Sequence, residues 1–164
     1  DSPIGRMIRS ALSDASLFHA QTVAYLFGAD RCEHIYGKNG IIEHLDAQQA
    51  VFCDRYLFSS LAYQGLTAGE PCAQAVNGQF PLPEYLFFFD LPAETAMQRI
   101  AQRNMPREIY EQEPFQQRVA QAYEYVLRQY ERTVPEMRII RIDAAEPIRK
   151  IHENIWSTVR NLPI

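Results

Sequence analysis

The sequence lacks the features that mark several large classes of protein. No apolar run approaches the ~20 residues that a membrane-spanning helix needs, and the start has neither the basic end nor the long apolar core of a signal peptide. The three cysteines are an odd number at wide spacings, so they indicate neither a disulfide framework nor a zinc site. The net charge of −4 argues against a surface for nucleic acid polymers, which need a basic stripe. We therefore expect a cytoplasmic protein whose partners include neither a membrane nor a nucleic acid polymer.

The composition that is present is typical of one globular domain. Hydrophobic residues make up 47% of the 164 residues and charged residues 22%, and no repeat or linker divides the chain. Three short apolar runs predict strands at about residues 50–54, 85–90 and 138–142. Helical patterns separate these runs. That alternation indicates an α/β domain with a parallel sheet that helices cover on both faces.

Apolar residues at helical spacing predict the helices of this domain. Ser2 is a possible cap and Pro3 suits a first turn, so one helix should run to about Leu12. Residues 66–83 receive no functional role. The same spacing predicts a short helix at 41–48 and longer ones at about 17–36, 92–103, 115–130 and 148–159.

Residues 54–65 form the most unusual stretch, Asp-Arg-Tyr-Leu-Phe-Ser-Ser-Leu-Ala-Tyr-Gln-Gly. It follows a predicted strand, and open α/β sheets bind ligands beyond the ends of their strands. The Asp54 carboxylate can hold a metal ion, and Arg55 can grip a phosphate through two parallel hydrogen bonds. The pair therefore suits phosphoryl chemistry, although the commoner role of such a dipeptide is to pair within itself or to cap the next turn.

Two further groups of residues each have two interpretations. Phe27 and Arg31 are four residues apart on a predicted helix and so share a face. Helix statistics alone favour a core Phe27 and a solvated Arg31. Between the second and third strands, arginines either close on a transferring phosphoryl group or form a solvated patch with nearby glutamates. These arginines are Arg99, Arg103, Arg107 and Arg118, and the glutamates are Glu108, Glu111 and Glu113.

The stretch at 54–65 resembles the signature segment of thymidylate kinases. Other segments resemble the same family in the same order, over nearly the whole chain. They are residues 3–5, 26–31, 89–94 with Arg99 and Arg103, 110–111, 115–119 with Tyr123, and 142–144. The resemblance implies a P-loop NTPase-like fold, with three α/β/α layers around a parallel sheet. It also implies one nucleoside monophosphate kinase domain over residues 1–164, with a lid region at about 103–114.

The family transfers the γ-phosphoryl group of ATP to thymidine monophosphate with Mg²⁺, so the resemblance implies ATP as co-substrate and Mg²⁺ as cofactor. It places Phe27 against the thymine ring and Arg31 at the edge of the base. It gives Arg55 the acceptor phosphate and Asp54 the magnesium ion or its waters. Positioning and charge neutralisation account for most of this kind of catalysis.

The resemblance also assigns the remaining substrate contacts and the lid. Ser60 matches a position that contacts the base, and Tyr63 matches the aromatic residue under the sugar. Arg103 and Arg107 match lid arginines that stabilise charge in the transition state. Gln64, Tyr110 and Gln116 match further substrate-binding positions. The family forms homodimers through helices of the first half of the chain, so a homodimer is also implied.

One departure from the family is large. No Gly-x-x-x-x-Gly-Lys-Ser/Thr motif occurs, so nothing in the sequence matches the loop that cradles the phosphates of ATP. We expect the natural polypeptide to be longer, with a strand, P-loop, helix and strand before Asp1. Two alternatives remain at this stage. One is a deoxynucleoside kinase, which phosphorylates a sugar hydroxyl, and the other is a non-catalytic nucleotide-binding or dimerisation module if Asp1 is the true start.

Overall fold

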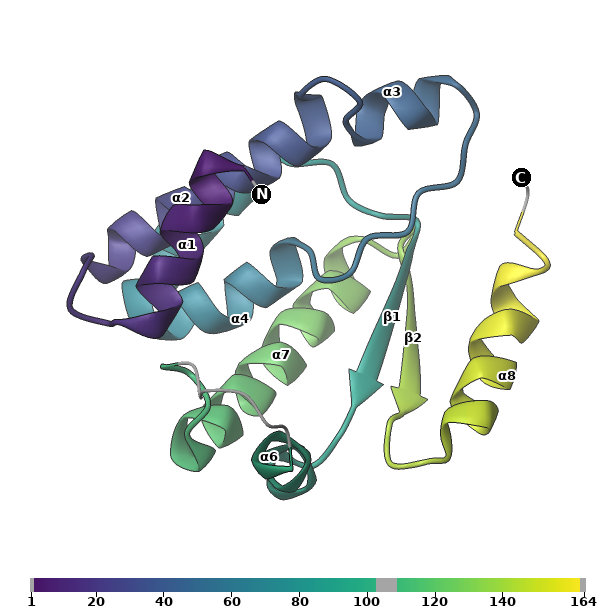
Figure 1. Cartoon of the computed structure of the whole chain (residues 1–164). Coiled ribbons are helices and arrows are strands. Elements are labelled where there is room, and N and C mark those ends of the chain that lie inside the picture. The colour runs from purple at the N-terminus through teal and green to yellow at the C-terminus, as the bar shows by residue number, and fades with distance from the viewer. Residues whose placement is uncertain (1, 103–108, 163–164) are drawn as a thin grey trace.

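The computed structural model describes residues 2–102 and 109–162. Two parallel strands form its sheet, β1 (Tyr85–Asp90) and β2 (Arg138–Asp143), which pair in register from one end to the other. Figure 1 shows α4 and α7 on one side of these strands and α8 on the other. The helices are α1 (Pro3–Ser13), α2 (Ala20–Tyr36), α3 (Ile41–Asp46), α4 (Leu57–Ala68), α5 (Glu70–Asn77), α6 (Ala93–Ala101), α7 (Glu113–Thr133) and α8 (Ile148–Val159).

Most of the predicted elements are confirmed. The strands at 85–90 and 138–142 form as β1 and β2, and the five longer helical patterns form as α1, α2, α6, α7 and α8. Ser2 caps α1, since its hydroxyl oxygen accepts a hydrogen bond of 2.8 Å from the amide of Gly5. No helix in residues 2–102 and 109–162 is both long and apolar enough to cross a membrane.

The first of the three predicted strands, at about residues 50–54, is not formed. Residues 49–53 have no regular secondary structure. An apolar run becomes a strand only beside a hydrogen-bonding neighbour, and among the described residues this run has none, since the sheet contains β1 and β2 alone. Phe52 is accordingly 68% exposed, and Phe89 on β1 is 51% exposed. The prediction that helices cover both faces of every strand therefore holds only in part for the described residues.

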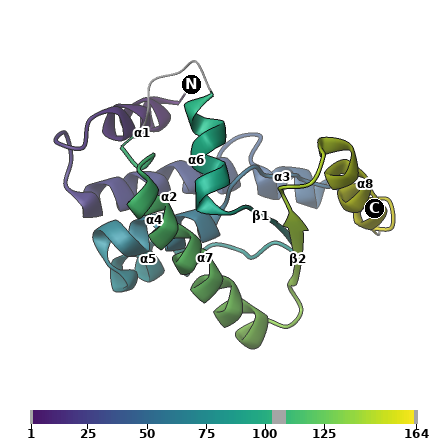
Figure 2. The same cartoon turned by 90° about the horizontal axis from the view of Figure 1, so that it is seen from below.

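Helix α4 lies at the centre of the helical layer. Its contacts reach α2, α5 and α7, and the side chains of Leu57 and Ala62 are fully buried. Figure 2 shows the group of α2, α4 and α5 well away from α8, which lies beside β2. The main core combines residues of these central helices with residues near the sheet: Ile35, Leu57, Phe58, Leu61, Ala73, Phe80, Val126, Leu127 and Met137. Because the first half of α4 is held by this core, polar side chains there, such as Ser60, have fixed positions.

Helices α2 and α5 approach each other at Gly28. A Cβ atom built on Gly28 would lie 2.4 Å from Cγ1 of Val76 on α5, which is closer than two carbon atoms can come. Val is stiff at χ1 and cannot swing away at low cost. The absence of a side chain at position 28 therefore sets the spacing of these two helices.

Candidate functional site

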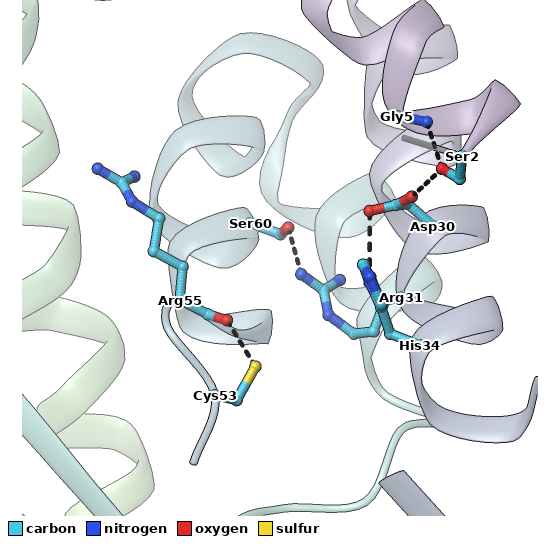
Figure 3. Close-up of polar contacts among 8 residues, drawn as sticks. All are labelled: Ser2, Gly5, Asp30, Arg31, His34, Cys53, Arg55 and Ser60. Carbon is cyan, nitrogen blue, oxygen red and sulfur yellow. Dashed lines mark hydrogen bonds and ion pairs between the residues drawn. The ribbon is translucent and has the colours of Figure 1, made fainter. Parts of the chain in front are cut away.

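Arg31 is the centre of a buried polar cluster between α2, α4 and α5. The residue is only 9% exposed. Its Nη2 donates a hydrogen bond of 3.0 Å to Oγ of Ser60, and its Nη1 donates one of 2.5 Å to Oδ1 of Asn77. Figure 3 shows the guanidinium of Arg31 directed toward Ser60. The interpretation of Arg31 as a solvated surface residue is therefore wrong, because helix periodicity carries no information on what the neighbouring helices bring to that face.

The charge of Arg31 has no carboxylate partner in the described part of the chain. Asp30 contacts His34 instead, at 3.5 Å. Burial lowers the pKa of the Arg31 guanidinium, and nearby groups, Tyr56 first among them, offset part of that effect. The guanidinium carbon lies 5.4 Å from the centre of the Tyr56 ring and 5.6 Å from that of Phe80, a distance at which aromatic rings stabilise a cation.

The cluster also holds unused hydrogen-bond donors. A guanidinium carries five N–H groups, and the contacts with Ser60 and Asn77 use two of them. The Nε–H of Arg31 is buried with no partner among the described residues. A buried donor without an acceptor costs about 1–3 kcal/mol. The cluster is therefore suited to a ligand that brings a carbonyl oxygen.

Arg55 stands at a bend just before α4 with an unusual backbone conformation. Its φ of 62° lies in the left-handed region, which costs a residue with a side chain roughly 1–2 kcal/mol. Its carbonyl oxygen accepts a hydrogen bond of 3.1 Å from Sγ of Cys53. Figure 3 shows the side chain pointing away from Arg31 and Ser60. The two cationic groups therefore lie at different places beside α4.

The Arg55 side chain lies against aromatic residues. Its guanidinium carbon is 5.8 Å from the centre of the Tyr63 ring. Burial alone would lower the pKa of this guanidinium, but the phenol groups of Tyr123 and Tyr63 and the carboxylate of Asp54 raise it above its usual value. Arg55 thus stays protonated at every physiological pH, and it can bind an anion such as phosphate.

Four of the predicted substrate contacts come together beside Arg55. The ring centres of Tyr63 and Tyr110 are 5.5 Å apart, and Nε2 of Gln116 donates a hydrogen bond of 2.8 Å to the carbonyl oxygen of Tyr110. Gln64 is 3% exposed and contacts the same ring. Burial raises the pKa of the Tyr110 phenol, while hydrogen bonds with Thr67 and Gln64 oppose the rise. The rings of Tyr63 and Tyr110 therefore form an aromatic surface beside Arg55, with the amides of Gln64 and Gln116 next to it.

Asp54 is exposed, and among the described residues it has neither a hydrogen-bond nor an ion-pair partner. The alternative that Asp54 and Arg55 form an ion pair with each other is thus not seen. No group of three metal-binding side chains occurs within residues 2–102 and 109–162. Mg²⁺ needs only one or two carboxylates besides waters and substrate phosphates, so a single free carboxylate fits this ion.

The other predicted site residues make no hydrogen bond, ion pair or ring contact with the side chain of Arg31 or Arg55 among the described residues. Phe27 lies one turn before Arg31 on α2 and is partly buried. Arg99 belongs to α6, and its Nη2 donates a hydrogen bond of 3.0 Å to the carbonyl oxygen of Ala144. Arg103 and Arg107 lie outside the described residues.

Sequence reasoning missed Asn77, since it gave residues 66–83 no role. A signal was present. Residues 73, 76, 77 and 80 share one helical face, and Asn77 is the polar member of an otherwise apolar set, with Ala73, Val76 and Phe80. A polar residue on a buried face needs a hydrogen-bond partner, which here is Arg31. Phe80, one of the rings beside Arg31, was missed for the same reason. The other ring, Tyr56, received no role although it lies in the stretch at 54–65.

Comparison with known proteins identifies the family of the chain. The family model described as thymidylate kinase matches residues 1–155. The chain belongs to the thymidylate kinase family. This family has the α/β fold of P-loop NTPases, and the two parallel strands with helices on both sides agree with that fold.

Individual thymidylate kinases match most of the chain. A protein of Treponema pallidum named "Putative thymidylate kinase" is 40% identical over 157 residues, which are 96% of this chain and 76% of that protein. A Staphylococcus epidermidis protein named "Thymidylate kinase" is 31% identical over 161 residues, covering 93% of this chain and 75% of that protein. A protein of the same kind from Aeropyrum pernix, also named "Putative thymidylate kinase", is 39% identical over 130 residues, or 78% of this chain and 61% of its own length.

Proposed function

We propose that this protein transfers the γ-phosphoryl group of ATP to thymidine monophosphate, giving thymidine diphosphate. Membership of the thymidylate kinase family supports the reaction. The observation that carries it is the pair of cationic sites along α4. Arg31 is buried, has unused N–H donors and contacts Ser60 on α4. Arg55 lies over the ring of Tyr63, which is one turn after Ser60 on α4. A base with carbonyl groups at one end and a phosphate at the other is complementary to that arrangement.

The roles of the site residues follow from this arrangement. Arg31 and Ser60 bind the edge of the base, and Phe27 packs against its face. Tyr63 supports the sugar, and Arg55 binds the acceptor phosphate. Gln64, Tyr110 and Gln116 surround Tyr63 and hold its ring in place. Arg103 and Arg107, outside the described residues, are proposed to stabilise the charge of the transferring phosphoryl group.

Asp54 is the residue that would hold Mg²⁺, through its free carboxylate. When bound, the ion neutralises charge on the phosphates. We further propose that a strand, P-loop, helix and strand unit, which this sequence does not contain, binds the phosphates of ATP. The unpaired apolar segment at 50–53 and the exposed rings of Phe52 and Phe89 support this, since further strands beside them would bury both rings.

A coupled assay of the natural polypeptide with ATP and Mg²⁺ tests the reaction. We expect turnover with thymidine monophosphate and little with thymidine, because Arg55 binds a phosphate that thymidine lacks. Calorimetry without ATP should show the monophosphate bound more tightly than thymidine. The reverse preference would favour a deoxynucleoside kinase, and failure to bind or turn over the monophosphate would overturn the proposal.

We also propose that the protein is a homodimer joined through α2. Tyr25 and Tyr36 are eleven residues apart, so they lie on one side of this helix, and they are 62% and 56% exposed. Cys32 is exposed on the same side. Sedimentation equilibrium should give twice the mass of the single chain, and the double variant Tyr25→Glu, Tyr36→Glu should give the single mass. A wild-type protein that stays monomeric at all concentrations would contradict the proposal.

A further inference from the structure

We propose that Asn77 is a positioning residue that fixes which N–H groups of Arg31 face the substrate base, and so makes the site select a carbonyl group over an amino group. This inference rests on the proposed function. It concerns a buried residue of α5 that accepts a hydrogen bond from Nη1 of Arg31, while Ser60 of α4 accepts one from Nη2.

The orientation of the Asn77 amide is itself fixed. Its Nδ2 donates a hydrogen bond of 2.7 Å to the carbonyl oxygen of Ala73, one turn earlier on α5. A flipped amide would turn its oxygen toward that carbonyl and its NH₂ toward the donors of Arg31, so both contacts would be lost. Asn77 is only 2% exposed, so water cannot replace either contact. The side chain therefore presents one acceptor, Oδ1, at one place.

Arg31 needs such an anchor because its hydrogen bond with Ser60 alone does not determine the rotation of its guanidinium. Buried arginines are commonly oriented by a carboxylate that accepts two parallel hydrogen bonds, and Arg31 has no carboxylate partner among the described residues. The rings of Tyr56 and Phe80 stabilise its charge but accept no conventional hydrogen bond in the plane of the group. Asn77 and Ser60 hold one nitrogen each, and two points in the plane are enough to fix its rotation.

The group held in this way offers only donors to a ligand. Arginine has no acceptor atom, so its remaining N–H groups attract a carbonyl oxygen and oppose an amino group. A pyrimidine with a carbonyl at the position that meets Arg31, such as thymine, satisfies the buried donors. Cytosine has an amino group there, and it would leave buried donors facing other donors. Sites built around a hydrogen bond reject such analogues strongly.

The test uses two variants of the natural enzyme, Asn77→Leu and Asn77→Asp. Leu has a similar size but no acceptor. With Asn77→Leu, we expect KM for thymidine monophosphate to rise about tenfold, the size expected when one hydrogen bond to a charged group is lost, with kcat within about twofold. The ratio of kcat/KM for thymidine monophosphate to that for deoxycytidine monophosphate should fall by a similar factor. Gln79→Leu, which removes an exposed amide two residues away, should leave all these values unchanged.

Asn77→Asp separates the positioning role from a structural one. It keeps an acceptor oxygen for Arg31 and adds a charge-assisted contact there, but it loses the donor to the Ala73 carbonyl. KM and the selectivity ratio should therefore stay within about threefold of wild type, whichever way the unfolding midpoint moves. The proposal is overturned if the Leu variant keeps KM and selectivity, or if the Asp variant loses both in step with its stability. If the Leu variant does not fold, the KM and selectivity of Asn77→Asp still test the proposal. A wild type without thymidine monophosphate turnover would instead overturn the proposed function.

Discussion

Arg55→Gln is expected to lower kcat/KM for thymidine monophosphate by about 10- to 150-fold. On the proposed role of Arg55, the substitution removes a charge-assisted hydrogen bond to the acceptor phosphate. Such bonds contribute about 1.5–3 kcal/mol, where each 1.36 kcal/mol is a factor of ten. The guanidinium is well prepared for this contact, since it lies over the Tyr63 ring and has a raised pKa. Steady-state kinetics with thymidine monophosphate varied at saturating ATP measures the effect.

Gln is chosen so that the substitution changes the charge at position 55 without changing the backbone strain. Arg55 has a φ of 62°, and Gly at this position would also relieve backbone strain, whereas Gln keeps it. The unfolding midpoint of Arg55→Gln should therefore match wild type. Arg149→Gln is the matched control, because Arg149 is 91% exposed on α8 and should not affect kinetics. An Arg55→Gln enzyme with unchanged kinetics would remove Arg55 from the acceptor site.

Leu127→Ala is expected to lower the free energy of unfolding by about 2–5 kcal/mol, a large part of the ~5–15 kcal/mol that stabilises an ordinary domain. Leu127 is fully buried on α7, in the core cluster that also contains Leu57 and Phe58 of α4. Truncation removes packed methyl groups and leaves a cavity that rigid helices cannot close. Urea unfolding, followed by the loss of helical circular dichroism, measures the change.

Leu17→Ala is the matched control for this prediction. The same atoms are removed, but Leu17 is 51% exposed before α2 and lies outside the core cluster. We expect a change within about 0.5 kcal/mol, as is usual for surface positions. Equal losses from the two substitutions would show that the cluster around Leu127 does not hold the helical layer together. Because that cluster fixes α4, the Leu127→Ala enzyme should also lose activity at a lower temperature than wild type.

The elements that sequence reasoning found are those whose signal is local. A capping serine before proline marks the start of α1, and a periodic apolar face marks α7 over six turns. The pair Asp54 and Arg55 was singled out through its chemistry, because an acid and a base follow an apolar run, whereas the bend at these residues was not predicted. Each of these features depends on residues within a few positions of one another, so one sequence contains the information.

Features that depend on distant residues were not found. The burial of Arg31 requires Ser60 and Asn77, which are 29 and 46 residues away. No periodicity within α2 reveals that its arginine faces two other helices. The apolar run before Asp54 was predicted as a strand, but strand formation depends on a partner strand, and its own side chains supply none. Pairing and burial are properties of the assembled chain.

The close approach of α2 and α5 at Gly28 bears on how substrate choice can vary. Arg31 follows Gly28 by three residues, and Asn77 follows Val76 by one, so the contact between backbone and Val76 sets the distance across which Arg31 reaches Asn77. On the proposed role of Asn77, a methyl group added at position 28 widens that gap without touching a ligand. Preference among pyrimidines can thus diverge through the interface between two helices, while every residue that faces the nucleotide stays the same.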